Sequence, residues 1–130
     1  MFLLDTNTII YHFKGMGRVS QNLGNTPPDE ILIPTIVVFE LYFGIKKSSA
    51  SAKRLQQLEE FLAQVQVIPF EKNMAEASAG IRAQLEKQGQ PIGSFDVLIA
   101  GAALATSSVL VTHNTREFSR VNDLSIVDWY

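Results

Sequence analysis

Residues 2 to 7, FLLDTN, place a short apolar run directly before an aspartate. The run has the composition of a short buried β-strand, whereas aspartate is poorly tolerated inside a strand. Asp5 therefore marks the end of the strand, either as a turn or helix-capping residue or as a functional carboxylate. In the first case we expect Asn7 to cap the helix that follows. This stretch by itself leaves both interpretations open.

Four similar apolar runs follow, each ended by polar or turn residues: ILI (31–33), VQVI (65–68), VLV (109–111) and SIV (125–127). Helical periodicity covers the stretches between the predicted strands, namely residues 7–14, 17–24, 35–47, 52–63, 73–88 and 94–105. We expect Thr35 and Ser94 to cap two of these helices. The alternation of strand and helix predicts an α/β fold, with helices covering both faces of a parallel sheet.

Length and composition limit the class of protein. A chain of 130 residues without an internal linker is expected to form a single domain over residues 1–130. The net charge of -2 does not by itself indicate a nucleic-acid-binding protein. The absence of cysteine excludes disulfides, zinc–thiolate sites and cysteine nucleophiles, and it fits a cytoplasmic location. No apolar run reaches the roughly 20 residues of a membrane span, so we expect no membrane association.

Glu40 stands out within the predicted helix 35–47. It shares a helical stripe with Phe39 and Phe43, so it interrupts an apolar face instead of lying opposite one. A buried carboxylate without a partner is strongly unfavourable. We therefore expect either a metal ion or a basic side chain beside Glu40.

Other polar residues fall where a parallel sheet binds ligands, beyond the carboxyl ends of its strands. Asp96 lies in the first turn of a strongly apolar helix, where it either complements the helix dipole or faces the same rim as Asp5. Asn114 and Glu117 follow the fourth predicted strand, as oxygen ligands or as parts of a polar loop. Carboxylates that converge repel one another, and a divalent cation relieves that repulsion.

The nature of the donors indicates which metal to expect. Oxygen ligands without cysteine or paired histidines favour Mg²⁺ or Mn²⁺ over zinc. We interpret His12 as a packing or surface residue and His113 as a surface residue or an outer neighbour of the site. Neither is expected to be a ligand.

These segments resemble the PIN-domain nucleases and, within them, the VapC toxins of bacterial toxin–antitoxin pairs. The matching segments occur in family order over nearly the whole chain: LLDTN (3–7), FELYFG (39–44), PIGSFDVLIAG (91–101) and VTHNTREF (111–118). The resemblance implies a PIN-like three-layer sandwich around a five-stranded parallel sheet in the order 3-2-1-4-5. One difference is visible. Where the family commonly has an aspartate shortly after the fourth strand, this chain has Asn114, with Glu117 further along.

The resemblance also implies an activity, hydrolysis of RNA phosphodiester bonds that depends on Mg²⁺ or Mn²⁺. Asp5 and Asp96 are then the metal ligands, Glu40 and Glu117 complete an acidic pocket, and Asn114 fixes the loop or a water. The implied partners are RNA (tRNA or another structured RNA), a VapB-like antitoxin and a second copy of the chain in a homodimer.

Two groups of side chains belong to the same expectation. Basic residues are candidates to hold phosphates around the acidic pocket, or else form solvated surface: Lys46, Lys47, Lys53, Arg54, Arg116 and Arg120. Apolar residues on helices near the site are more numerous than one small sheet needs, so we expect another chain to bury part of them: Ile9, Ile10, Phe13, Tyr42, Phe43 and Leu55.

Two other classes of protein fit part of the pattern. A receiver-like phosphoacceptor domain also has an acidic Mg²⁺ pocket, but its phosphorylated aspartate ends the third strand, where this chain has Pro69. A catalytically silent PIN-like module that binds RNA or protein fits the same segments, and the altered position at Asn114 keeps this alternative open. Cleavage of RNA distinguishes the nuclease from the silent module.

Overall fold

A five-stranded sheet forms the centre of the protein in the computed structural model, which describes residues 1–130. Its strands are β1 (Phe2–Leu4), β2 (Ile31–Pro34), β3 (Gln66–Ile68), β4 (Val109–Val111) and β5 (Ile126–Val127). All neighbouring strands are parallel, in the order β3-β2-β1-β4-β5. The predicted α/β class, the parallel sheet and its strand order are therefore confirmed.

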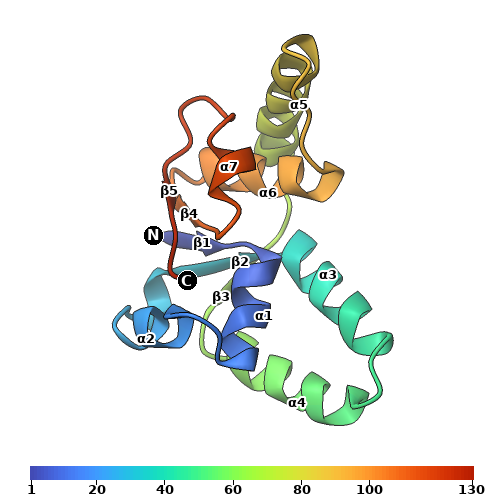
Figure 1. Cartoon of the computed structure of the whole chain (residues 1–130), viewed down its shortest axis with the longest axis vertical. Helices are drawn as coiled ribbons and strands as arrows, with labels where there is room; N and C mark the ends of the chain where they lie inside the picture. The colour runs from blue at the N-terminus through green and yellow to red at the C-terminus, as the bar shows by residue number, and fades with distance from the viewer.

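Helices cover both faces of this sheet. They are α1 (Thr6–Lys14), α2 (Val19–Gly24), α3 (Thr35–Lys46), α4 (Ser51–Leu62), α5 (Lys72–Lys87), α6 (Ser94–Ala105) and α7 (Thr115–Phe118), and a 3-10 turn (Pro28–Glu30) precedes β2. In Figure 1, α5 and α6 lie on one side of the sheet, and α1, α2 and α4 lie on the other. None of the helices has the length and apolar character needed to cross a bilayer.

The core is built on the central strand, β1. Leu3 and Leu4 point to opposite faces of the sheet, and both are fully buried because helices cover each face. On one face, α5 and α6 pack closely around Gly101. A β-carbon at this position would lie 1.9 Å from Oγ of Ser78, so only glycine fits the contact between the two helices.

The expected helix caps were wrong in three places. Asp5, not Asn7, occupies the N-cap of α1, and its side chain accepts a hydrogen bond from the backbone N–H of Thr8. Thr35 and Ser94 are the first helical residues of α3 and α6, so the N-cap positions fall one residue earlier and have no side-chain cap bond. In both cases the helix begins immediately after a residue with extended or otherwise non-helical backbone.

Candidate active site

The parallel pairing of β1 with β4 brings distant parts of the chain to one edge of the sheet. Leu4 is in register with Val111, so the residues that follow both strands leave the sheet side by side. The backbone N–H of Asp5 donates to the carbonyl of Val111 at 3.2 Å, which fixes the end of β1 against the end of β4. The carboxyl ends of these central strands therefore meet at the place where ligands bind in parallel sheets.

Asp5 is both a helix cap and a buried carboxylate. Its Oδ1 accepts hydrogen bonds from the backbone N–H of Thr8 at 2.9 Å and from the hydroxyl of Thr8 at 2.6 Å. The side chain is 5% exposed, and this burial raises the pKa of Asp5. Hydrogen bonds from Thr112 and Thr8 act in the opposite direction, and the charge of Asp128 adds to the increase. The two interpretations of Asp5 that the sequence left open are thus compatible.

The pKa of Asp96 shows that the acidic residues lie close enough to affect one another. It lies in the first turn of α6, and burial raises its pKa to about 6 from 3.8. The charges of three other carboxylates add to this increase: Asp5, Glu40 and Glu117. Four of the five predicted site residues are therefore carboxylates that share one electrostatic environment.

Glu40 is placed differently from the expectation. The buried residues of α3 are Val37 and Leu41, whereas Phe39 and Phe43 on the predicted stripe are 54% and 57% exposed. The prediction that Glu40 interrupts a core-facing stripe is therefore wrong. Glu40 is half-buried, no basic side chain forms a salt bridge with it, and its Oε1 accepts a hydrogen bond of 2.6 Å from the hydroxyl of Thr6.

The segment after β4 positions Asn114 and Glu117. The side-chain amide of Asn114 donates to Oε2 of Glu117 at 3.0 Å, and the backbone N–H of Asn114 donates to the hydroxyl of Thr112 at 3.0 Å. Asn114 therefore holds Glu117, and Glu117 is the member of this pair whose charge acts on Asp96. The short helix α7, which carries Glu117, was not predicted.

The two histidines lie where the sequence suggested. His12 is half-buried, with its Nδ1 2.8 Å from the hydroxyl of Ser20 and its ring 5.6 Å from that of Phe61. His113 is exposed, and its Nδ1 lies 2.9 Å from Oδ2 of Asp128. His12 is thus a packing residue, and His113 belongs to the surroundings of the acidic pocket.

Sequence reasoning missed several neighbours of the carboxylates. Thr6, Thr8 and Thr112 supply the hydroxyls that orient Glu40 and Asp5. A signal for Asp128 was available, because it follows the fifth predicted strand in the same way that Asp5 follows the first. The rule that ligands bind beyond the carboxyl ends of parallel strands could have found it.

The carboxylate oxygens of the pocket suit a hard divalent cation, although they do not form a complete set of ligands around one point. No group of three acidic or histidine side chains is close enough to hold one metal ion by itself. Mg²⁺ usually takes one or two carboxylates and keeps several waters, so such a cage is not required. Burial raises the pKa of Asp96 and the neighbouring carboxylates raise it further, and a cation would relieve the repulsion between these carboxylates.

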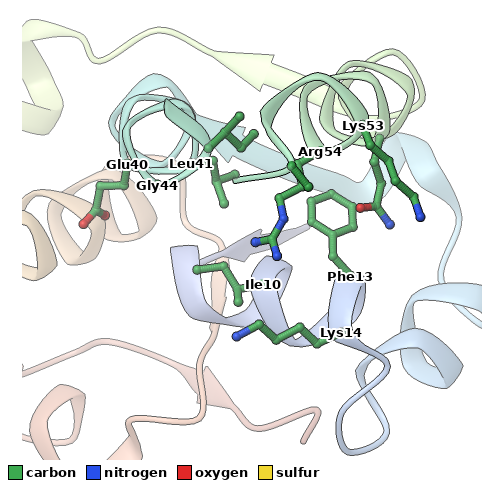
Figure 2. Close-up of a pocket in the computed structure, with 11 residues that line it drawn as sticks. Ile10, Phe13, Lys14, Glu40, Leu41, Gly44, Lys53 and Arg54 are labelled. Atoms are coloured by element: carbon green, nitrogen blue, oxygen red, sulfur yellow. The ribbon is translucent and has the colours of Figure 1, made fainter. Parts of the chain in front are cut away.

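A groove of about 480 Å³ lies beside Glu40, between α1, α3 and α4. Its apolar lining includes Ile10 and Phe13, and its basic lining consists of Lys14, Lys53 and Arg54. Figure 2 shows Glu40 at one end of the groove and Lys53 at the other, with Arg54 and Lys14 reaching toward the middle from opposite walls. The groove therefore combines an apolar lining with charges of both signs.

The family model of the PIN domain matches residues 2–124. The chain belongs to the PIN-domain family. This PIN domain is 35% identical over 128 residues to a curated protein from Shigella flexneri, "tRNA(fMet)-specific endonuclease VapC", and the match covers 98% of this chain and 97% of the relative. It thus belongs to the VapC group, as its motifs suggested.

Solved structures agree with this assignment. This PIN domain superposes with a TM-score of 0.93 on VapBC2 from Rickettsia felis bound to a promoter DNA fragment, at 32% identity and covering 99% of this chain and 98% of the other. DNA-bound VapBC from Salmonella typhimurium gives the same TM-score of 0.93 at 34% identity, with the same coverage of 99% and 98%. The receiver-like interpretation is therefore excluded.

Proposed function

We propose that this PIN domain is the toxin of a toxin–antitoxin pair and acts as a Mg²⁺-dependent endoribonuclease, with Mn²⁺ as a possible substitute. The observation that carries the proposal is the convergence of the charges of Asp5, Glu40 and Glu117 on Asp96. It occurs in a chain that is 35% identical to a protein named as a tRNA(fMet)-specific endonuclease. Transfer RNA is therefore the first substrate to test, followed by other structured RNAs.

Asp5 and Asp96 are the proposed metal ligands. A bound Mg²⁺ would supply Lewis acidity at the phosphoryl oxygen and lower the pKa of water. Thr8 holds the carboxylate of Asp5 in place by donating two hydrogen bonds to Oδ1. The same bonds tie Asp5 to the first turn of α1, so the ligand is fixed by the fold.

Glu40 and Glu117 are the proposed groups that orient the attacking water or accept its proton. Thr6 fixes Glu40 by donating to Oε1, and Asn114 fixes Glu117 by donating to Oε2. A positioned carboxylate that acts as a general base contributes roughly 10²–10⁴-fold to a rate. No histidine is needed for this step.

The RNA backbone has to be held outside the acidic pocket, since the pocket repels phosphates. Lys46, Lys47 and Arg116 are exposed and free to contact phosphates. Arg120 donates to the carbonyl of Pro91 at 3.3 Å, so it braces the loop before α6 as well. Contacts of this kind add affinity for RNA that decreases as the salt concentration rises, and they do not distinguish one RNA sequence from another.

The groove beside Glu40 is the proposed site of an antitoxin segment. The similar solved structures are VapBC complexes, and the groove offers an apolar lining that ends at a carboxylate of the pocket. A guanidinium placed near Glu40 can replace the charge of a metal ion and form paired hydrogen bonds with carboxylates. We propose that an arginine or lysine of the antitoxin reaches Asp5, Glu40 and Asp96 and so blocks catalysis.

Titration of the antitoxin peptide tests this mechanism. The peptide with its basic residues intact should inhibit RNA cleavage, and the peptide with those residues changed to alanine should inhibit much less. Equal inhibition by both peptides would refute the mechanism and leave the toxin assignment standing.

A homodimer is the second proposed assembly. The expected surplus of exposed apolar side chains is present at Phe43 and Leu55, which are 57% and 42% exposed, but not at Ile9, which is fully buried in the core. Tyr42 is half-buried and donates to Glu59. Sedimentation velocity over a range of protein concentrations measures the association, and a monomer at every concentration contradicts it.

Cleavage assays with purified protein test the catalytic proposal. The chain should cleave tRNA or another structured RNA in Mg²⁺, and EDTA should abolish the cleavage. Asp5→Asn and Asp96→Asn should be inactive while their circular dichroism spectra match that of the parent. A folded parent that cleaves no RNA in Mg²⁺ or Mn²⁺ would support the silent binding module, which the named relatives do not favour.

A further inference from the structure

Three phenylalanines form an exposed ridge beside the acidic pocket. Phe39 and Phe43 lie on α3 and Phe95 lies on α6, and their exposed fractions are 54%, 57% and 43%. The rings of Phe39 and Phe95 have centroids 5.6 Å apart and are tilted by 47°, so they contact each other across the two helices. We call these three residues the phenylalanine ridge.

The ridge adjoins the proposed catalytic groups along both helices. Phe39 directly precedes Glu40, and Phe95 directly precedes Asp96. The contact between the two rings therefore lies beside the pair of carboxylates. A substrate whose phosphodiester reaches the pocket has to bring its neighbouring nucleotides close to this ridge.

The charge of the protein shows why such a surface is useful. The pocket is acidic and the whole chain carries a net charge of -2, so contacts with phosphates alone would bind RNA weakly. Stacking of bases on aromatic rings supplies affinity without basic residues, and surfaces that bind single strands combine such rings with nearby cations. Lys47 provides the cation, since its Nζ lies 5.1 Å from the ring centroid of Phe43.

We propose that Phe39 and Phe95 are positioning residues that stack an unpaired nucleobase next to the scissile phosphodiester, with Lys47 on the adjoining phosphate. The inference rests on the proposed function, because it takes RNA as the substrate. It adds that the nucleotide beside the cleaved bond is single-stranded, as in a loop. A second copy of the chain is the competing occupant, because an exposed apolar surface can also be a protein interface.

Leucine substitutions separate these two occupants. Leucine keeps the apolar character on which a protein interface depends, but it removes the aromatic face on which a base stacks. Phe95→Leu and Phe39→Leu should therefore weaken RNA binding, whereas Phe95→Trp should retain it. Val67→Ala, which changes an exposed apolar residue of β3, is the matched control and should leave RNA binding unchanged.

The probe is a single-stranded oligoribonucleotide that contains 2-aminopurine, whose fluorescence is quenched on stacking. Binding is measured in EDTA, so that no cleavage occurs. We expect quenching by the parent protein, and about tenfold weaker binding with loss of quenching in each leucine variant, in line with the stacking contribution of one base. In Mg²⁺, the same variants should lower kcat/KM for RNA cleavage by a similar factor.

Either of two results with variant proteins would overturn the proposed stacking on Phe39 and Phe95. One is a leucine variant that binds and quenches the probe as the parent does. The other is a double variant, Phe39→Ala with Phe95→Ala, that changes from dimer to monomer in sedimentation while probe binding is unaffected. Results with the parent protein separate the stacking from the proposed function. If the parent quenches the probe but cleaves no RNA in Mg²⁺, the proposed function is refuted and the stacking is supported. If it cleaves RNA without quenching the probe, the stacking is refuted and the proposed function is supported.

Discussion

Replacement of Asp96 by asparagine should make the metal-free protein more stable at neutral pH. The change removes one charge from the acidic pocket and keeps the size of the side chain. Burial raises the pKa of Asp96 to about 6 from 3.8, and nearby carboxylates add to the increase. That difference corresponds to at most about 3 kcal/mol at pH 7. Because the side chain is only half-buried, solvent screening should reduce the effect to about 1.5 kcal/mol.

A smaller effect opposes this gain. Asp96 lies in the first turn of α6, where its negative charge interacts favourably with the helix dipole. Loss of that interaction costs roughly 0.3–1 kcal/mol. The net expectation is a gain of roughly 0.5–1 kcal/mol for Asp96→Asn, which corresponds to about 2–4 °C in Tm for a domain of this size.

The gain should depend on pH in a defined direction. The pKa of Asp96 is higher in the folded protein than in the unfolded chain, so the folded state binds more protons between about pH 4 and pH 6. The parent therefore loses stability as the pH rises through this range. The advantage of Asp96→Asn should be small near pH 4.5 and fully developed above pH 7.

Urea denaturation of both proteins in EDTA at pH 5 and pH 7.5 measures this difference. Addition of Mg²⁺ should then raise the Tm of the parent more than that of the variant, because binding to the folded state stabilises it. A variant that is less stable than the parent at both values of pH would show that Asp96 acts mainly as a helix-terminal residue. The argument for a repulsive acidic pocket would then fail.

Three other substitutions test separate parts of the structure. The glutamine in Glu40→Gln can still accept the hydrogen bond from Thr6. The free energy of unfolding in urea should therefore change by less than about 0.5 kcal/mol, whereas the rate of RNA cleavage should fall roughly 10²–10⁴-fold. Asp5→Ala removes the cap of α1 and should cost roughly 0.5–2 kcal/mol in thermal melts, whereas Asp5→Asn keeps a good capping residue and should not. Gly101→Ala places a methyl group 1.9 Å from Oγ of Ser78, so the midpoint of urea unfolding should fall by the equivalent of about 1–3 kcal/mol, and an unchanged midpoint would contradict the close contact between α5 and α6.

The regular elements could be predicted well because their signals are local. The strands 2–4 and 109–111 and the helix 94–105 have the predicted bounds. In the first two, a short apolar run is buried on both faces of a parallel sheet and ends at a polar residue. The other predicted elements differ by one or two residues at one or both ends. The helix α7 has only four residues, too few to show a helical period.

The face of α3 could not be predicted in the same way. Apolar side chains occur on most sides of this helix, so a stripe through Phe39 and Phe43 looked like the core face. The residues that reach the core are Val37 and Leu41 instead. A helix that is apolar all round gives no directional signal, and only its packing against the neighbouring elements determines which side is buried.

The polar residues of the site were predictable as types and positions, but their partners were not. Asp5, Asp96 and Glu117 follow from the rule that ligands bind beyond the ends of parallel strands. The hydroxyls of Thr6 and Thr8 became visible only in the structure, because hydrogen bonding depends on side-chain direction as well as on sequence position. The same bonds explain how Asp5 can cap α1 and still face the proposed site.

Helix α3 separates the two surfaces that adjoin the acidic pocket, and this separation has a consequence for inhibition. Leu41, Gly44 and Ile45 of α3 line the groove, and Phe39 belongs to the phenylalanine ridge. Glu40 lies in the helix between these surfaces and contacts the pocket. A segment bound in the groove can therefore reach the carboxylates without covering the rings.

We expect a saturating antitoxin peptide to stop RNA cleavage in Mg²⁺ but to leave at least part of the 2-aminopurine quenching in EDTA. Complete loss of quenching would mean that the peptide extends across α3 to the ridge and competes with the base as well as with the metal ion.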